Sequence, residues 1–268
     1  EIPQTSAKGK EDTFNIKEKG MKALRMIISR NKRNQEMLFD SINKLIDELS
    51  NILYFRTKQD LKWGSVVIVT IAEIFRGNQK LGLKVPTRLF DVVQQYLTKK
   101  AQSHKEYLHE NDLAIFQSLT VVDDTIIRKN QNRTVKAILG NKKGNLNNPR
   151  LLLYSSSVGS SHERRLQALS RYKGNVEGVL TYHVKLLQVL STSCRGEATL
   201  EEVLCKPLIP FQELVDAAKD DRLPRSMRLA ILGYIYDVFI DSGIAGESSE
   251  TLQKALPTLL KVCLSELK

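Results

Sequence analysis

The sequence has few cysteines, few aromatic residues and no long apolar stretch. Its three cysteines, Cys194, Cys205 and Cys263, are an odd number in apolar helical surroundings, so we expect no disulfide framework and a reducing cytosol. The longest apolar stretch, Val66 to Ala72, is followed by Glu73 and is far shorter than the ~20 residues that a membrane-spanning helix needs. Any attachment to a membrane is therefore expected outside this segment. The chain does not begin with Met, and we expect it to be part of a longer protein.

Complete catalytic and phosphate-binding motifs are also missing. Residues 140–144 lack the spacing of a phosphate-binding loop, and residues 158–162 lack the second glycine of a nucleophile elbow. Calcium loops need oxygen ligands at alternate positions, which the adjacent pairs Asp123-Asp124 and Asp220-Asp221 do not supply. We expect both pairs to begin or end helices, because carboxylates are favourable near helix N-termini. The sequence thus assigns no catalytic or cofactor-binding residue and predicts that the chain is not an enzyme.

A zinc site would have to use His183, Cys194 and Cys205. Their spacing matches no zinc finger, and only three ligands are in view where a structural site needs four. His183 also shares a helical stripe with Leu187, Leu190 and Cys194, which favours a role in capping or packing a helix. We therefore assign no metal-binding residue.

Helical periodicity dominates the remaining sequence and predicts an all-α fold. Apolar residues recur at three- and four-residue steps in three stripes, each of which we expect on one helix face: Leu38, Ile42, Leu45, Ile46, Leu49 and Leu53; Leu89, Val92, Val93, Tyr96 and Leu97; and Met227, Ala230, Ile231, Tyr234, Ile235 and Val238. Pro86 and Pro224 precede the second and third stripes, as is favourable near a helix start. Helices of this length with short polar joins predict one domain over residues 1–268, an armadillo-like α-solenoid of stacked helices.

Two segments are ambiguous as helices. Residues 63–75 contain a β-branched run with strand propensity, but no hairpin or parallel partner follows, so we expect a helix that is buried on most sides. Residues 248–267 predict a final helix that Pro257 should kink or split.

The positive charge is concentrated in one segment. The whole chain has a net charge of +11, and residues 128–173 alone carry 11 basic residues and one acidic residue. Residues 139–173 are also rich in Asn, Gly and Ser, which predicts a long basic loop that projects from the helices. The loop is either a solvated segment or a surface for phosphates or an acidic protein. With Tyr154 and Tyr172 as its only aromatic residues, it does not favour nucleic acid.

The most specific pattern in the chain lies between Tyr182 and Val215. An apolar helix is followed by a glycine break, a short turn, a cysteine and a second helix that begins near a proline; the residues that carry the pattern are Tyr182, His183, Leu186, Leu190, Gly196, Glu202, Cys205, Leu208, Pro210 and Val215. This pattern resembles the RIH homology domain of inositol trisphosphate receptors, which ryanodine receptors share in part. Weaker similarity covers Asn34 to Asn43, Ile126 to Lys129 and Met227 to Asp241. The chain departs from the family at Ser193, where the receptors have the cysteine, and at Leu200, where they have a tyrosine.

The resemblance implies a structural segment of an intracellular calcium-release channel. Such a segment would lie on the cytosolic face of the endoplasmic reticulum or of a related calcium store, in a homotetramer. Its partners would be neighbouring domains and other subunits, and it would couple ligand binding to gating. The family's ligand-binding residues, pore and ATP site lie elsewhere, so none is carried over. Gly196 and the 139–173 loop would supply local flexibility or a docking surface. The alternative is a free-standing armadillo scaffold that binds an acidic protein through its basic loop.

Overall fold

A computed structural model of the chain describes residues 7–54, 57–103, 107–139, 176–196, 198–221, 223–241 and 249–266. Within them the fold is all-α, as the sequence predicts, with one two-stranded hairpin. The first half contains α1 (Ala7–Ile28), α2 (Lys32–Phe39), α3 (Ile42–Ile52), α4 (Lys58–Phe75), α5 (Gln79–Gly82), α6 (Thr87–Ser103), η2 (Glu110–Leu113), α7 (Ala114–Thr120), β1 (Val121–Val122), β2 (Thr125–Ile126) and α8 (Arg128–Leu139). The second half contains α11 (Val176–Cys194), α12 (Thr199–Cys205), η3 (Lys206–Leu208), α13 (Phe211–Lys219), α14 (Arg225–Ile235), the π-helix η4 (Tyr236–Ile240) and α15 (Ser249–Glu266).

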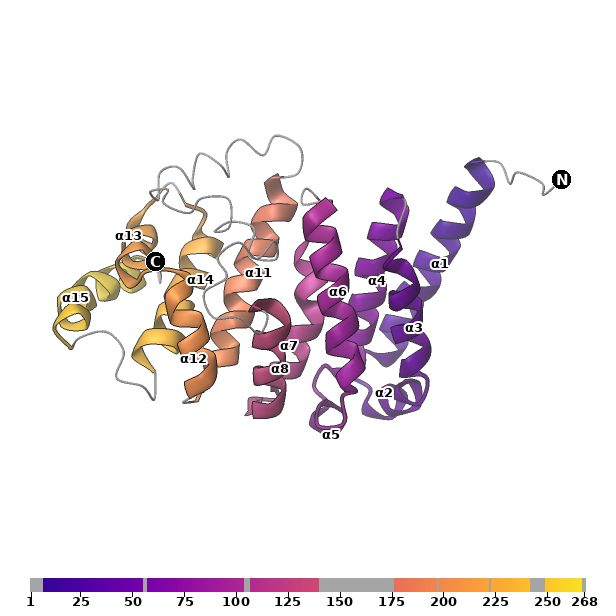
Figure 1. The fold of residues 1–268 in the computed structure, drawn as a ribbon, viewed down its shortest axis with the longest axis horizontal. Coiled ribbons are helices and arrows are strands. Elements are labelled where there is room, and N and C mark those ends of the chain that lie inside the picture. The colour runs from indigo at the N-terminus through magenta and orange to yellow at the C-terminus, as the bar shows by residue number, and fades with distance from the viewer. Residues whose placement is uncertain are drawn as a thin grey trace.

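The helices form an elongated row that follows the order of the chain. In Figure 1 the row begins with α1 to α4, continues through α6, α7, α8 and α11, and ends with α12 to α15. The elements pack against others that lie near them in the row: α4 packs against α1, α3, η2 and α7, and α11 packs against η2, α7, α8, α12 and α14. One apolar core runs along the whole row; it includes Ile46 of α3, Ile71 of α4, Tyr96 of α6, Val135 of α8 and Tyr234 of α14.

Several predicted helices are confirmed. The stripe that begins at Leu89 is buried on α6, and the stripe that begins at Met227 is buried on α14 and η4. The ambiguous residues 63–75 lie in α4, whose last nine residues are all buried except Val69. This helix begins with a capping box in which Thr57 and Asp60 each accept a hydrogen bond from the other's backbone N–H. None of the described helices is both long enough and apolar enough to span a membrane.

Two local predictions differ from the structure, and a third, the kink or split at Pro257, is wrong only as to the split. The stripe from Leu38 to Leu53 is divided between α2 and α3, because Ser41, with φ −100° and ψ 9°, departs from helical geometry. Helix α15 contains Pro257 and is not split. Asp123 and Asp124 do not begin or end a helix, since they form the turn between β1 and β2.

The hairpin turn has a specific backbone requirement. Val121 pairs with Ile126 and Val122 with Thr125, which leaves Asp123 and Asp124 as a two-residue loop. Their φ angles of 47° and 60° are those of the tight turn that matches the twist of the strands, and aspartate tolerates this region better than most residues. For the other acidic pair, Asp220-Asp221, the prediction of a helix end is confirmed, because Asp220 ends α13.

The predicted basic loop lies almost entirely outside the described residues. Leu139 is the last residue of α8, and residues 140–175 are not described, so the loop predicted for 139–173 stays a prediction. Residues 128–139, the first part of the basic segment, form α8. Two of its arginines bind backbone oxygens of other segments: Arg128 donates to Arg195 and Arg133 donates to Val85.

Candidate functional site

The Tyr182 to Val215 pattern forms a helix joint. Helix α11 ends at Cys194, the chain turns at Gly196, and α12 and η3 lead to α13, which follows Pro210. Most of the residues that carry the resemblance are buried: Tyr182, His183, Leu186, Leu190, Glu202, Cys205 and Val215. Packing therefore accounts for most of the pattern.

Gly196 is required by its backbone conformation. Its φ of 75° lies in the left-handed region, where glycine has no steric penalty. A Cβ at this position would also lie 2.8 Å from Cδ1 of Ile126 and 3.0 Å from Nη2 of Arg128. The turn is thus closely packed against the hairpin and α8, and the flexibility predicted for Gly196 is not favoured by these contacts.

The joint binds both neighbouring parts of the row. On one side, Gln131 of α8 donates to the carbonyl oxygens of Thr192 (3.0 Å) and Arg195 (3.3 Å), and Arg128 donates to the latter at 2.9 Å. On the other side, Asp237 of η4 accepts from Ser191 and pairs with Arg195 at 3.4 Å. These contacts connect the end of α11, and the turn that follows it, to α8 and to η4.

The three candidate zinc ligands do not assemble. His183 precedes Cys194 by eleven residues in α11, which is about 16 Å along a helix axis. The thiols of Cys194 and Cys205 do meet. Hydrogen bonding to Cys205, together with burial, raises the pKa of the Cys194 thiol, which therefore stays protonated and unreactive. The described residues contain no group of three or more His, Cys, Asp and Glu side chains that could hold a metal ion.

Glu202 is an unexpected feature of the same cluster. It is completely buried, its carboxylate further raises the pKa of Cys194, and neither of its oxygens has a hydrogen-bond partner among the described residues. Buried polar groups normally have such partners. This burial could not be predicted from the sequence, because Glu202 lies in the first turn of α12, where acidic residues are common.

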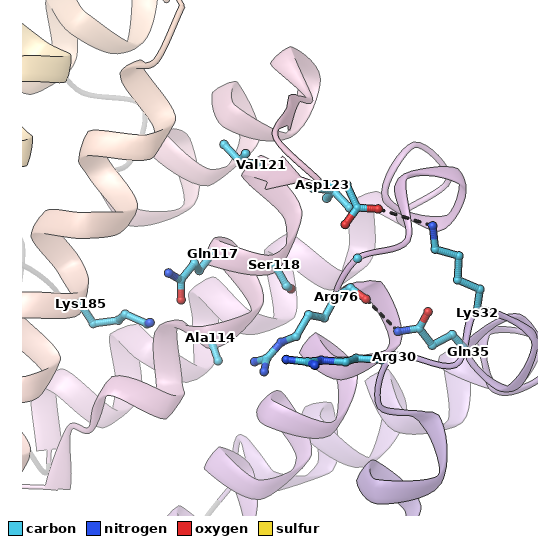
Figure 2. A pocket seen from close by; sticks show the side chains of 12 residues that line it. Arg30, Lys32, Gln35, Arg76, Ala114, Gln117, Ser118, Val121, Asp123 and Lys185 are labelled. Atoms are coloured by element: carbon cyan, nitrogen blue, oxygen red, sulfur yellow. Dashed lines mark hydrogen bonds and ion pairs between the residues drawn. The ribbon is translucent and has the colours of Figure 1, made fainter.

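A second site was not predicted: a basic pocket of about 850 Å³ between the N-terminal helices and α11. Four cations line it, namely Arg30 from the α1–α2 turn, Lys32 from α2, Arg76 from the end of α4 and Lys185 from α11. The rest of the lining includes Gln35, Gly77, Ala114, Gln117, Ser118, Val121, Val122 and Asp123. In Figure 2, Arg30 and Arg76 extend from one side and Lys185 extends from α11 toward them.

The backbone around the basic pocket is unusual. Arg30, Gly77 and Asp123 all have φ in the left-handed region, at 55°, 67° and 47°. Each follows the end of a helix or strand and turns the chain at the edge of the pocket. Left-handed conformations cost energy for residues other than glycine and are frequent at binding sites.

Gln35 fixes one wall of the pocket. Its buried amide donates to the carbonyl oxygens of Glu73 (2.9 Å) and Arg76 (2.8 Å) and accepts from the amide of Asn78 (3.2 Å). The bond to Arg76 is drawn in Figure 2. Gln35 is one of the residues that carry the weaker resemblance in the sequence, and the structure gives it this clamping role.

The charges of the pocket are only partly balanced. Lys32 pairs with Asp123 at 3.5 Å, and Arg76 pairs with Glu73 at 3.3 Å. Arg30 and Lys185 have no ion pair within the described part of the chain. Partial burial lowers the pKa of Lys185; Glu110 opposes this change, and Arg76 lowers the pKa further. The pocket thus keeps an excess of positive charge although its cations repel one another.

The sequence could not reveal this pocket, because Arg30 and Lys185 are separated by 155 positions. Arg30 lies in a basic turn and Lys185 lies among apolar residues of α11, and neither belongs to a local anion-binding motif. A comparison of the chain with models of known protein families gives no match.

Proposed function

We propose that the chain is a structural, signal-relaying segment of an inositol trisphosphate receptor-like calcium-release channel. It would lie on the cytosolic face of a calcium store, and it has no catalytic role in this proposal. The observation that carries the proposal is the joint between α11 and α13, in which residues that resemble the receptors occupy the core and connect two parts of the row.

The arrangement of the helices supports a relay. Because the elements pack against others that lie near them in the row, a small rotation at one end would pass from helix to helix along the row. The joint is the point at which α8 and η4 both bind the end of α11, so displacement of the first half would act there on the second half. The buried core through the row makes such a displacement collective.

The gene provides the first test. A ligand-binding region encoded upstream and a cluster of membrane spans encoded downstream are expected. A short gene that lacks both would contradict the proposal and would favour the free-standing scaffold that binds an acidic protein through residues 128–173.

The second test perturbs the joint in the full-length protein. Gln131→Ala removes two hydrogen bonds to the end of α11, whereas Lys129→Ala on the exposed face of the same helix removes none that the structure shows. Calcium release from isolated stores is measured against agonist concentration for both variants. We expect Gln131→Ala to shift the half-activating concentration with tetramer assembly unchanged, and Lys129→Ala to behave as wild type. Equal behaviour of the two variants would contradict a relay through the joint.

A further inference from the structure

We propose that the basic pocket binds a small anion that carries two or more phosphate groups. The inference depends on the pocket alone and holds whether or not the chain is part of a channel. The volume of about 850 Å³ lies within the range of small-molecule sites, and the lining is rich in donors that suit phosphate.

The charges of the lining predict that the ligand is an anion. Four basic residues and one acidic residue, Asp123, line the pocket. Arg30 has no ion pair among the described residues, and its guanidinium can donate two parallel hydrogen bonds to a phosphate. Lys185 adds a point charge from the other side (Figure 2). Because the cations approach from opposite sides, a ligand with more than one phosphate can contact both.

The free pocket is electrostatically unfavourable, and an anion would relieve this. Partial burial and the nearby Arg76 both disfavour the charged form of Lys185. An anion between the two side chains would favour that form again. The left-handed backbone at Arg30 and Asp123 adds a second unfavourable contribution to the free energy of the empty pocket. Costs of this kind are typical of sites that are formed before the ligand arrives.

Binding would connect four separate segments of the row. The ligand would contact the α1–α2 turn, the end of α4, the region of α7 and β1, and α11. Any ligand that binds only the folded state stabilises it in proportion to the logarithm of its concentration. Occupancy is therefore expected to raise the unfolding temperature and to restrict movement between α4 and α11.

The experiment uses isothermal titration calorimetry on the purified chain with sodium tripolyphosphate, at low and constant ionic strength. Two variants each remove one cation of the pocket, Arg30→Gln and Lys185→Gln. Lys44→Gln removes one cation from the exposed face of α3 and controls for net charge. Lys185→Arg keeps the charge in the pocket. Circular dichroism without ligand verifies that every variant is folded.

We expect one tripolyphosphate per chain and about tenfold weaker binding, or more, in each pocket variant, because each loses a charge-assisted contact. Lys44→Gln should remain within about twofold of wild type, and Lys185→Arg should bind more tightly than Lys185→Gln. No binding, or an equal loss in Lys44→Gln and the pocket variants, would overturn the proposal. Displacement of tripolyphosphate by an equally charged polyglutamate peptide at lower concentration would also overturn it, since the pocket would then be a docking site for acidic proteins.

Discussion

Removal of the buried cation Lys100 should destabilise the fold strongly. Lys100 of α6 contacts both oxygens of Asp112 in η2, at 3.0 and 2.8 Å, and the side chains are 2% and 0% exposed. It also donates to Ser65 at 3.0 Å and Tyr96 at 3.2 Å. Asp112 in turn accepts from Ser65 and from the backbone of His109. The group joins α4, α6 and η2 in the interior.

The magnitude follows from what remains after the substitution. In Lys100→Met the carboxylate of Asp112 stays buried without its cation, which costs about 3–5 kcal/mol. This is a large part of the total stability of a domain, about 5–15 kcal/mol. The pair of Lys80 and Glu36 provides a matched control. Its distance is nearly the same, 2.9 Å, but its side chains are 62% and 43% exposed, so Lys80→Met should cost only about 0–1 kcal/mol.

A double variant determines whether the buried charge is the cause. Asp112→Asn removes the charge and keeps one oxygen that can accept from the backbone N–H of His109, while its NH2 group can donate to the Ser65 hydroxyl. Added to Lys100→Met, it should recover about 1–3 kcal/mol. Lys100→Met with Asp112→Asn is thus expected to be more stable than Lys100→Met alone.

Urea unfolding followed by far-ultraviolet circular dichroism measures these differences from the midpoint and slope of each transition. The reasoning would be refuted if Lys100→Met cost no more than Lys80→Met. It would also be refuted if the second substitution further destabilised Lys100→Met.

Three further predictions concern single positions, each measured by the same unfolding assay. Gly196→Ala should cost about 1–2 kcal/mol of stability from its left-handed backbone alone. Gly20→Ala, with open space around it in α1, should be neutral or should stabilise the fold by up to about 1 kcal/mol. A larger loss of stability in Gly20→Ala than in Gly196→Ala would contradict this. Gly64→Ala should cost about 1–3 kcal/mol, because its Cβ would lie 2.4 Å from the Tyr96 ring, and an unchanged midpoint would be inconsistent with that packing. Burial raises the pKa of Asp237, so its protonated form stabilises the fold below the unfolded pKa, and this contribution is lost as the pH rises through the folded pKa. Asp237→Asn should therefore gain stability relative to wild type as the pH rises above about 4, the ordinary pKa of an aspartate, and the opposite slope would disprove it.

The helices were predictable to the extent that their burial is one-sided and regular. The stripes that begin at Leu89 and Met227 are buried on α6 and on α14 with η4, because a repeat of three and four residues places them on one face. The division between α2 and α3 was not predictable from the apolar pattern, because the stripe continues across it. The hairpin turn at Asp123 was missed because the same acidic pair is equally suited to a helix end, and the strands on either side of it have only two residues each.

The candidate sites were also predictable only in part. The joint was located from sequence because its residues lie in one short stretch from Tyr182 to Val215 and because packing restricts most of them. Its binding to α8 and η4 required the structure, since Gln131 and Asp237 are distant in sequence and are ordinary polar residues in their own helices.

The sequence by itself determined the all-α fold class, the absence of an apolar stretch long enough to span a bilayer, and the position of the joint, because these depend on local periodicity and composition. Only the tertiary structure decided that Lys100 is balanced by Asp112 and that Arg30, Arg76 and Lys185 line one pocket. The physical reason is that the energy of a charge depends on its burial and on the charges near it in space, and neither is encoded in the residues beside it in the chain.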